Sequence, residues 1–127
     1  MTDDEALELS MELLKRLKDS SPAHLGALFA KGGIVWHNHD RIDLDAHVDC
    51  NMIAGLREQF DDLDFRYVES AGIPKGFLLR FVMSGKGRTD GRRMEGHNCL
   101  VAEMRRDLIW RIDEYVDPNL LGNISPV

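Results

Sequence analysis

Three strand-like segments carry the side chains best suited to moving a proton. Glu114 lies between Ile112 and Val116 on one face of a predicted strand, so its carboxylate would be partly desolvated. Desolvation would raise the pKa of Glu114 toward the range that suits general acid–base catalysis. Asn38 and Asn98 carry amides that can donate hydrogen bonds to a substrate carbonyl or a developing oxyanion. Glu114 is therefore the main candidate for proton transfer, with Asn38 and Asn98 as orienting donors.

Each candidate also has an ordinary structural explanation. Glu114 could be solvated, or paired with Arg80 or Arg111. The two asparagine amides could instead bond buried backbone groups. His97 stands beside Asn98 and would take its place on the inner side if a β-bulge shifted the alternation. The sequence leaves these alternatives open.

Two histidines alternate on the first predicted strand, so His37 and His39 point to the same face. Together with Asp40 or Asp43 they suggest a metal site, but a closed site needs a further protein ligand. We expect no metal here. We assign these histidines to the surface or to a dimer interface.

The composition is that of one ordinary globular domain. The chain has 127 residues, of which 43% are hydrophobic and 30% charged, and this excludes a disordered or low-complexity protein. The net charge of −6 argues against a nucleic-acid partner. No apolar segment approaches the roughly 18 residues of a membrane span, and the acidic N-terminus is unlike a secretory signal. We therefore expect a cytoplasmic protein with no membrane partner, in which Cys50 and Cys99 are free thiols.

Helices come first along the chain and strands follow. The periodicity predicts helices over residues 3–19, 22–30 and 43–60, with Asp43 as the cap of the last. It predicts strands over residues 34–39, 64–71, 77–84, 92–104 and 108–117, and a tail over 119–127. This order favours an α+β domain in which three helices cover a curved antiparallel sheet around an apolar pocket.

An apolar repeat selects a buried side for the third predicted helix. Val48, Met52, Leu56 and Phe60 recur every four residues. We expect this row to pack against the sheet.

The element order and two short motifs resemble the nuclear transport factor 2-like superfamily. One motif is Val35-Trp36-His37-Asn38, in the first strand after the helix pair, and the other is residues 108–117, which resemble the closing strand of the superfamily. The resemblance covers roughly residues 5–118 and implies one SnoaL-like domain with a cone-shaped fold. Enzymes of the superfamily include ketosteroid isomerases, SnoaL-like polyketide cyclases, limonene epoxide hydrolases and scytalone dehydratases.

The resemblance also implies which side chains face the pocket. Ketosteroid isomerases place their base at about the position of Asn38, and SnoaL-like cyclases place an acid–base group near His97 and Asn98. Limonene epoxide hydrolases pair two side chains with the spacing of Trp36 and Asn38, and Glu114 falls at the last Asp of their catalytic group. We therefore expect the pocket side to carry Trp36, Asn38, Asn98 and Glu114.

The same resemblance implies a set of substrate-binding side chains, most of them apolar. They are Trp36, Phe60, Arg80, Phe81, Ile112 and Val116. If His37 and His39 faced the pocket instead, they would be similar to the acid–base histidines of scytalone dehydratase. Enzymes of the superfamily mostly work without metal, so we expect no metal and no other cofactor.

These expectations point to a cofactor-free enzyme that moves a proton in a small, apolar, oxygenated ring compound held in the cone. The reaction would be isomerisation, cyclisation, dehydration or epoxide opening. The alternative is a non-catalytic module of the same fold that binds a small ligand or dimerises. We also expect a homodimer through the open face of the sheet, where Val68, Leu79, Val101 and Tyr115 would lie.

Overall fold

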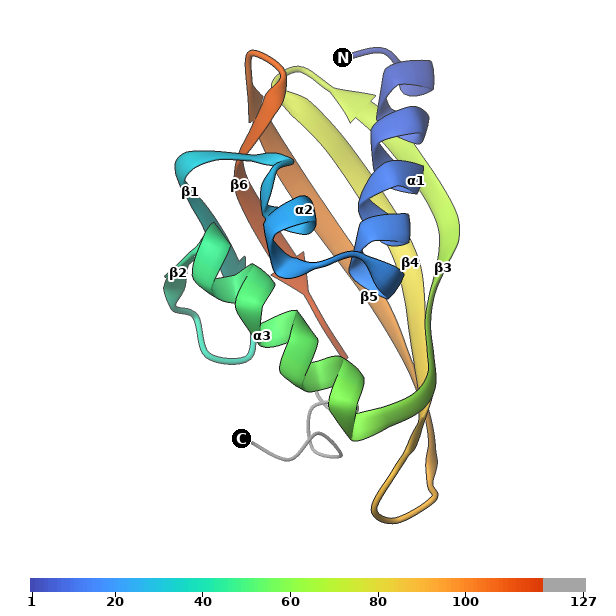
Figure 1. Cartoon of the computed structure of the whole chain (residues 1–127). Coiled ribbons are helices and arrows are strands. Elements are labelled where there is room, and N and C mark those ends of the chain that lie inside the picture. The colour runs from blue at the N-terminus through green and yellow to red at the C-terminus, as the bar shows by residue number, and fades with distance from the viewer. Residues whose placement is uncertain (118–127) are drawn as a thin grey trace.

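The computed structural model describes residues 1–117, which form three helices and six strands (Figure 1). In chain order these are α1 (Asp3–Asp19), α2 (Pro22–Gly26), β1 (Phe29–His37), β2 (Asp43–Asp45), α3 (Ala46–Gln59), β3 (Phe60–Ile73), β4 (Gly76–Gly87), β5 (Arg93–Arg105) and β6 (Leu108–Tyr115). The predicted tail over residues 119–127 lies outside the described residues.

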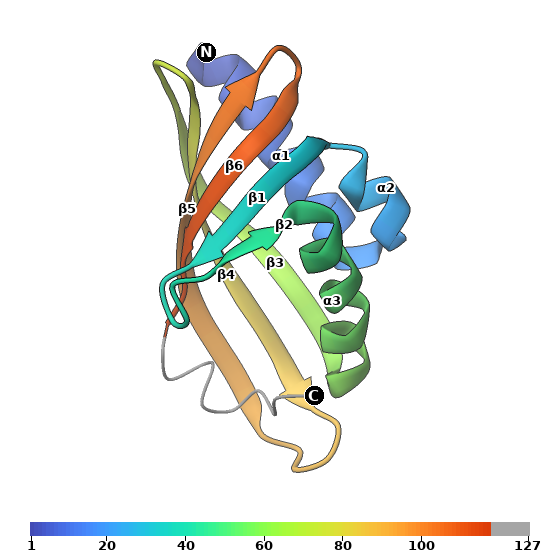
Figure 2. The same cartoon turned by 90° about the vertical axis from the view of Figure 1, so that its left-hand side faces the viewer.

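The six strands form one open sheet in the order β2-β1-β6-β5-β4-β3. Strand β1 runs parallel to β6, and the other neighbouring pairs are antiparallel. The sheet curves, and the helices lie on one side of it, which we call the inner face (Figure 2). The predicted cone-shaped α+β fold is confirmed, but the sheet is mixed rather than purely antiparallel. A parallel pair needs a long crossover connection, and here most of the chain serves as that connection.

Helix α1 begins and ends with strong local signals. The Thr2 side chain accepts a hydrogen bond from the Glu5 backbone N–H, and the Glu5 side chain accepts one from the Thr2 N–H. Acidic residues fill its first turn and basic residues its last, which suits the helix dipole. Leu13 and Leu14 are buried on the side that faces the sheet. No helix within residues 1–117 is long and apolar enough to cross a membrane.

Arg57 of α3 ties the end of α1 to the rest of the domain. Its guanidinium donates to the carbonyl oxygens of Arg16 at 2.7 Å and Leu17 at 2.6 and 3.0 Å, and also to the carbonyl oxygen of Ser20. The last carbonyls of a helix lack partners within it, so this one side chain satisfies groups that would otherwise need water.

The second helix is shorter, and the first strand longer, than the sequence predicts. Helix α2 ends at Gly26, and β1 already begins at Phe29. The pairing of β1 with β6 shifts between Phe29 and Ile34, and Gly32 in between has a φ of +76°. The Gly32-Gly33 pair therefore marks an irregularity inside the strand and not the end of a helix.

Helix α3 begins later than expected, because a short edge strand precedes it. Residues 43–45 form β2, and Asp45 rather than Asp43 caps the helix. The Asp45 side chain accepts hydrogen bonds from the backbone N–H groups of His47 at 2.9 Å and Val48 at 3.2 Å. The strand and the helix predicted for this region keep their order along the chain, and β2 is an additional strand between them.

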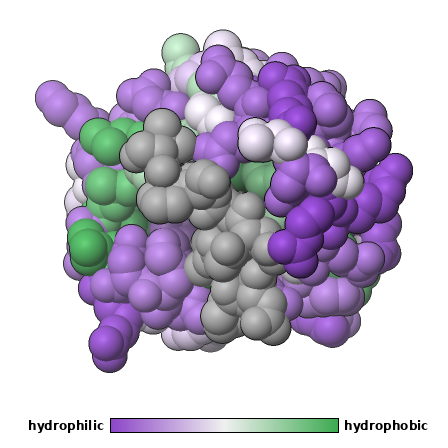
Figure 3. Space-filling view, turned by 90° about the horizontal axis from the view of Figure 1, so that it is seen from below, coloured by the Kyte–Doolittle hydropathy of each residue, from purple (hydrophilic) through white to green (hydrophobic). Residues whose placement is uncertain are grey.

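The predicted buried side of α3 is correct only toward its C-terminal end, where Leu56 packs against the core and Phe60 is buried. Val48 and Met52 are 48% and 60% exposed, whereas Ala46 and Cys50 are buried. Seen from below, the surface is mostly hydrophilic, and hydrophobic residues gather along the side where Figure 1 places β2 and α3 (Figure 3). The N-terminal part of the helix thus departs from the sequence expectation, and a different set of side chains faces the sheet there.

The core fills the space between the helices and the inner face. Phe77, Leu79 and Leu100 on β4 and β5, with Ile109 on β6, are almost completely buried. The expectation that Leu79 lies on the outer face is therefore wrong. Residues 77, 79 and 81 alternate along β4, so all three point inward and are packed beneath the helices.

Candidate functional site

The parallel pairing of β1 with β6 decides which side of β1 faces inward. Val35 lies opposite Ile112, and both are buried in the core. His37 lies opposite Glu114 two residues further on, so it shares that inner face. Trp36 points outward and packs against Tyr115, with the ring centroids 5.5 Å apart. The prediction that Trp36 lines the pocket is wrong, as is the assignment of His37 to the surface or a dimer interface.

His37 and Glu114 form an ion pair on the inner face. The Nε2 atom of His37 lies 3.3 Å from Oε1 of Glu114, and each side chain is 19% exposed. Burial of the imidazole opposes its protonation. The contact with Glu114 and the charges of Glu114, Asp49 and Asp40 outweigh burial and raise the pKa of His37 from 6.5 to about 8. At neutral pH His37 is therefore mostly an imidazolium.

This pair makes the stability of the fold depend on pH. Because the pKa of His37 is higher in the folded chain, its stabilising contribution is complete below pH 6.5 and disappears as the pH rises through about 8. The difference between the two pKa values corresponds to about 2 kcal/mol. We expect urea unfolding of the wild type to show the free energy of unfolding falling between about pH 6 and about pH 9. In His37→Gln this fall should be smaller, because the variant has no imidazole to titrate. An NMR titration that places the pKa of His37 below 6.5 would contradict this.

Asp49 reaches the same site from α3. Burial raises its pKa from 3.8 to about 6; the charge of His37 opposes this rise, and the charges of Glu114 and Asp40 add to it. The sequence did not single out this residue, because Val48 and Met52, rather than Ala46 and Cys50, were expected to face the sheet. Asp49 is three residues after the buried Ala46, and this spacing is the signal that could have found it.

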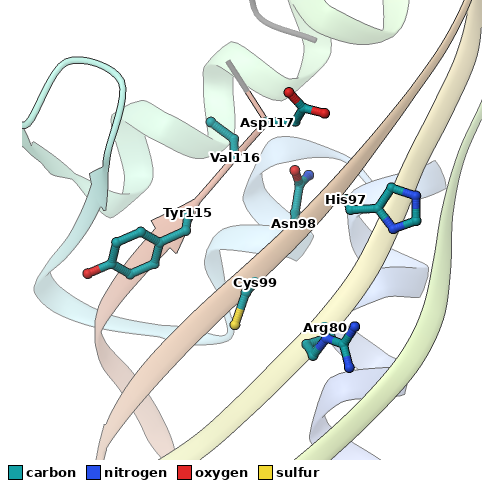
Figure 4. A pocket seen from close by; sticks show the side chains of 7 residues that line it. All are labelled: Arg80, His97, Asn98, Cys99, Tyr115, Val116 and Asp117. Atoms are coloured by element: carbon teal, nitrogen blue, oxygen red, sulfur yellow. The ribbon is translucent and has the colours of Figure 1, made fainter. Parts of the chain in front are cut away.

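Asn98 provides the fourth polar side chain of the candidate site. It pairs with Phe81 across β5 and β4, its side chain is only 6% exposed, and its Oδ1 atom has no hydrogen-bond partner within residues 1–117. Asn98 and Cys99 leave β5 in opposite directions (Figure 4). Leu100 lies opposite Glu114, so Asn98 is a diagonal neighbour of Glu114 on the same face.

A hollow of about 320 Å³ reaches Asn98 where β6 ends (Figure 4). It is lined by Arg80, His97, Asn98, Cys99, Tyr115, Val116 and Asp117. A second hollow, of about 590 Å³, lies near the β5–β6 turn and includes Met1, Met104 and Asp107, but none of the four polar residues of the candidate site. Of these two hollows, only the first includes a polar residue of the candidate site, Asn98, and most of its lining side chains belong to the outer face of the sheet.

Asn38 uses its amide to hold the end of β6. Its Oδ1 atom accepts a hydrogen bond from the Val116 backbone N–H at 2.9 Å, and its Nδ2 atom donates to the Val116 carbonyl at 3.4 Å. The Asn38 backbone N–H also donates to the Glu114 carbonyl. These bonds favour the structural role that the sequence left open for Asn38, and they position Glu114.

His97 and Arg80 lie on the outer face. His97 is exposed and lies 3.4 Å from Glu95, and Arg80 is exposed and paired with Glu69. The pairing of β5 with β4 is continuous through this region, so no bulge brings His97 inward. The expectations that His97 substitutes for Asn98, and that Arg80 binds substrate, are therefore not supported by where these side chains lie.

The remaining predicted wall residues belong to the apolar core. Phe60, Phe81, Ile112 and Val116 are all buried. His39, by contrast, sits at the surface beside Asp40, with 3.5 Å between Nε2 and Oδ2. Within residues 1–117 no group of three or more His, Cys, Asp or Glu side chains is arranged to hold a metal ion.

Comparison with known proteins finds similarity in structure alone. No protein-family model and no curated protein matches this sequence. PrhC from Penicillium brasilianum superimposes with a TM-score of 0.83 at 12% identity, over 97% of this chain and 87% of that one. A SnoaL-like polyketide cyclase from Agrobacterium tumefaciens gives 0.68 at 15% identity, over 88% and 91%.

A protein from Catenulispora acidiphila with a ketosteroid isomerase-like fold, in complex with trimethylamine, gives a TM-score of 0.76 at 12% identity. That match covers 89% of this chain and 93% of the other. At these identities the similarity establishes the fold alone, and any chemistry has to be argued from the residues of the site. The chain has the nuclear transport factor 2-like fold that its sequence resembles, in the form found in ketosteroid isomerase-like and SnoaL-like proteins.

Proposed function

We propose that this SnoaL-like chain is a cofactor-free enzyme that transfers a proton within a small, apolar, oxygenated ring compound. The observation that carries the proposal is the His37–Glu114 ion pair, with the charge of Asp49 acting on it, on an inner face whose buried side chains are mostly apolar. Ionisable groups are costly to bury, so they concentrate where chemistry needs them. The reaction would be an isomerisation, a cyclisation, a dehydration or an epoxide opening.

The charges suggest a division of labour. At neutral pH, Asp49 is mostly ionised and His37 mostly protonated, because their pKa values are about 6 and about 8. Asp49 can take a proton from carbon next to a carbonyl, and His37 can give one to oxygen. Glu114 keeps His37 charged and in place, and Asn98 orients the substrate. Each step moves one proton and needs no cofactor.

A screen of cyclic enones, epoxides and hydroxy ketones tests this proposal. The wild type should turn over at least one of them, and His37→Gln and Asp49→Asn should both be slower. An outer-face variant, Glu95→Gln, should match the wild type, because Glu95 is exposed and bonds only His97 among the described side chains. If His37→Gln and Asp49→Asn are as fast as the wild type on a substrate that is turned over, the proposal is wrong.

We also infer a homodimer through the outer face of the sheet. Tyr115 is 49% exposed there and contacts Trp36, while Val101 on β5 is partly buried. Val68 is also exposed, and large apolar side chains on an open sheet favour a protein partner.

Sedimentation should show a mass that depends on concentration. Tyr115→Lys should shift the equilibrium toward monomer by about tenfold or more, because it buries a charge in the interface. The matched control is Leu108→Lys, at a similarly exposed apolar side chain beside the β5–β6 turn. A wild type that stays monomeric at all concentrations would rule out the dimer.

A further inference from the structure

Four side chains form a continuous row of contacts from the candidate site to the surface. The Nε2 atom of His37 lies 3.3 Å from Oε1 of Glu114. The ring centroids of His37 and His39 are 5.4 Å apart, and Nε2 of His39 lies 3.5 Å from Oδ2 of Asp40. The exposed fraction of the side chains rises along this row, from 19% for both members of the inner pair to 38% for His39 and 42% for Asp40. The row therefore connects the inner pair to solvent through a second imidazole.

The turn that joins β1 to β2 holds the outer half of this row in place (Figure 2). The Arg41 backbone N–H donates to the His37 carbonyl at 2.9 Å, which closes the turn around His39. The Oδ1 atom of Asp40 accepts a hydrogen bond from the Ile42 backbone N–H at 3.1 Å, and its other oxygen, Oδ2, is the one near His39. The backbone of the turn thus fixes where the second imidazole and its carboxylate lie.

The proposed reaction requires a route by which His37 regains its proton. When His37 gives a proton to substrate oxygen, its ring becomes neutral. Whenever the product leaves with that proton, His37 needs another one before it can act again. A neutral imidazole has one nitrogen that donates and one that accepts, so one histidine can pass a proton to another. His39 is the neighbouring ring, and it is twice as exposed as His37.

We propose that His39 relays protons between solvent and His37. In each transfer an N–H bond of the protonated His39 ring breaks and an N–H bond forms on the neutral His37 ring, and a water molecule between the rings can carry the proton. His39 then takes a proton from water or from a buffer acid, so protons and charge balance. The Asp40 carboxylate orients the His39 ring. This inference rests on the proposed function, because it replaces the proton that His37 gives to substrate.

Exchange of the His37 ring N–H with water tests the relay without any substrate. Saturation transfer from water in the ¹⁵N-labelled full chain measures the exchange rate by NMR. His39→Phe keeps a ring against His37 and removes both nitrogens, so exchange should slow by about tenfold. His39→Gln should slow it as well, because an amide does not shuttle protons. Free imidazole added to either variant should speed exchange up again, since it performs the same transfer from solution.

His97 provides the matched control. It is a histidine 3.4 Å from a carboxylate, Glu95, and both lie on the outer face, away from His37. His97→Phe therefore makes the same chemical change as His39→Phe outside the row, and exchange at His37 should stay at the wild-type rate. On a substrate from the screen, His39→Phe should lower kcat by up to about tenfold with KM unchanged, and free imidazole should restore kcat.

The outcomes separate this inference from the proposed function. The relay is overturned if exchange at His37 is as fast in His39→Phe as in the wild type, or if His97→Phe slows it equally. It is also overturned if His39→Phe turns over a substrate with the kcat of the wild type. If the screen finds no substrate, the proposed function fails, and the exchange rates still decide whether His39 passes protons to His37.

Discussion

Glu114→Gln is expected to lower turnover by about 10²–10⁴-fold while the fold and ligand binding persist. The amide keeps the shape of the side chain and removes its charge. His37 then loses the partner 3.3 Å away that favours its protonated form, so its pKa should fall. Rate measurements on a substrate from the screen give the first effect, and an NMR titration of His37 gives the second.

Combining His37→Gln with Glu114→Gln shows whether the two residues act together or independently in the reaction. If His37 and Glu114 work as one unit, the double variant His37→Gln, Glu114→Gln should be no slower than the worse single variant. Glu95→Gln serves as the control, because it removes a carboxylate beside a histidine on the outer face. Should Glu114→Gln turn over substrate as fast as the wild type, the role given to Glu114 is wrong, and Asp49 is the next residue to test.

Asp49→Asn is expected to stabilise the fold at alkaline pH while it slows the reaction. The pKa of Asp49 is raised in the folded chain, so ionising it costs folding free energy. That cost is absent below pH 3.8 and complete above about pH 6, where it amounts to up to about 3 kcal/mol. The uncharged amide avoids it at every pH.

Urea unfolding at two pH values measures this effect. Near pH 8 the variant should be more stable than the wild type, and near pH 4 the two should differ little. Asp107→Asn should leave the free energy of unfolding almost unchanged at both, since that side chain is exposed. If Asp49→Asn is less stable than the wild type near pH 8, the ionised Asp49 carboxylate stabilises the fold and the expectation is wrong.

Local patterns in the sequence predict much of this fold. Helix α1 has the expected bounds, because its capping signals and its apolar side agree. In β5 and β6, alternation separates Asn98 from His97 and Glu114 from Tyr115, and the resemblance selects Asn98 and Glu114 for the inner face, where the structure has them. These elements are long and regular, so a short window of sequence contains all the information that is needed.

The errors arise where the local pattern fits two arrangements. Alternation along β1 separates Trp36 from His37, but which of the two faces inward depends on pairing with β6, far away in the sequence. Val35 is the anchor, because it is an apolar residue that fills the core opposite Ile112. Similarly, α3 has two apolar sides, and only its contact with the sheet decides between them.

The parallel pairing of β1 with β6 has a consequence for the order in which the molecule assembles. Asn38 and Val116, joined by two hydrogen bonds, are 78 residues apart, and closing so long a loop is slow. While β6 is still being synthesised, β1 has already left the ribosome. The edge of β1 that pairs with β6 stays unpaired until β6 is available. The helices and the β3–β4–β5 meander can form meanwhile. The imidazole of His37 and the carboxylate of Glu114 meet only when β1 pairs with β6, so a chain that lacks this pairing carries no assembled site.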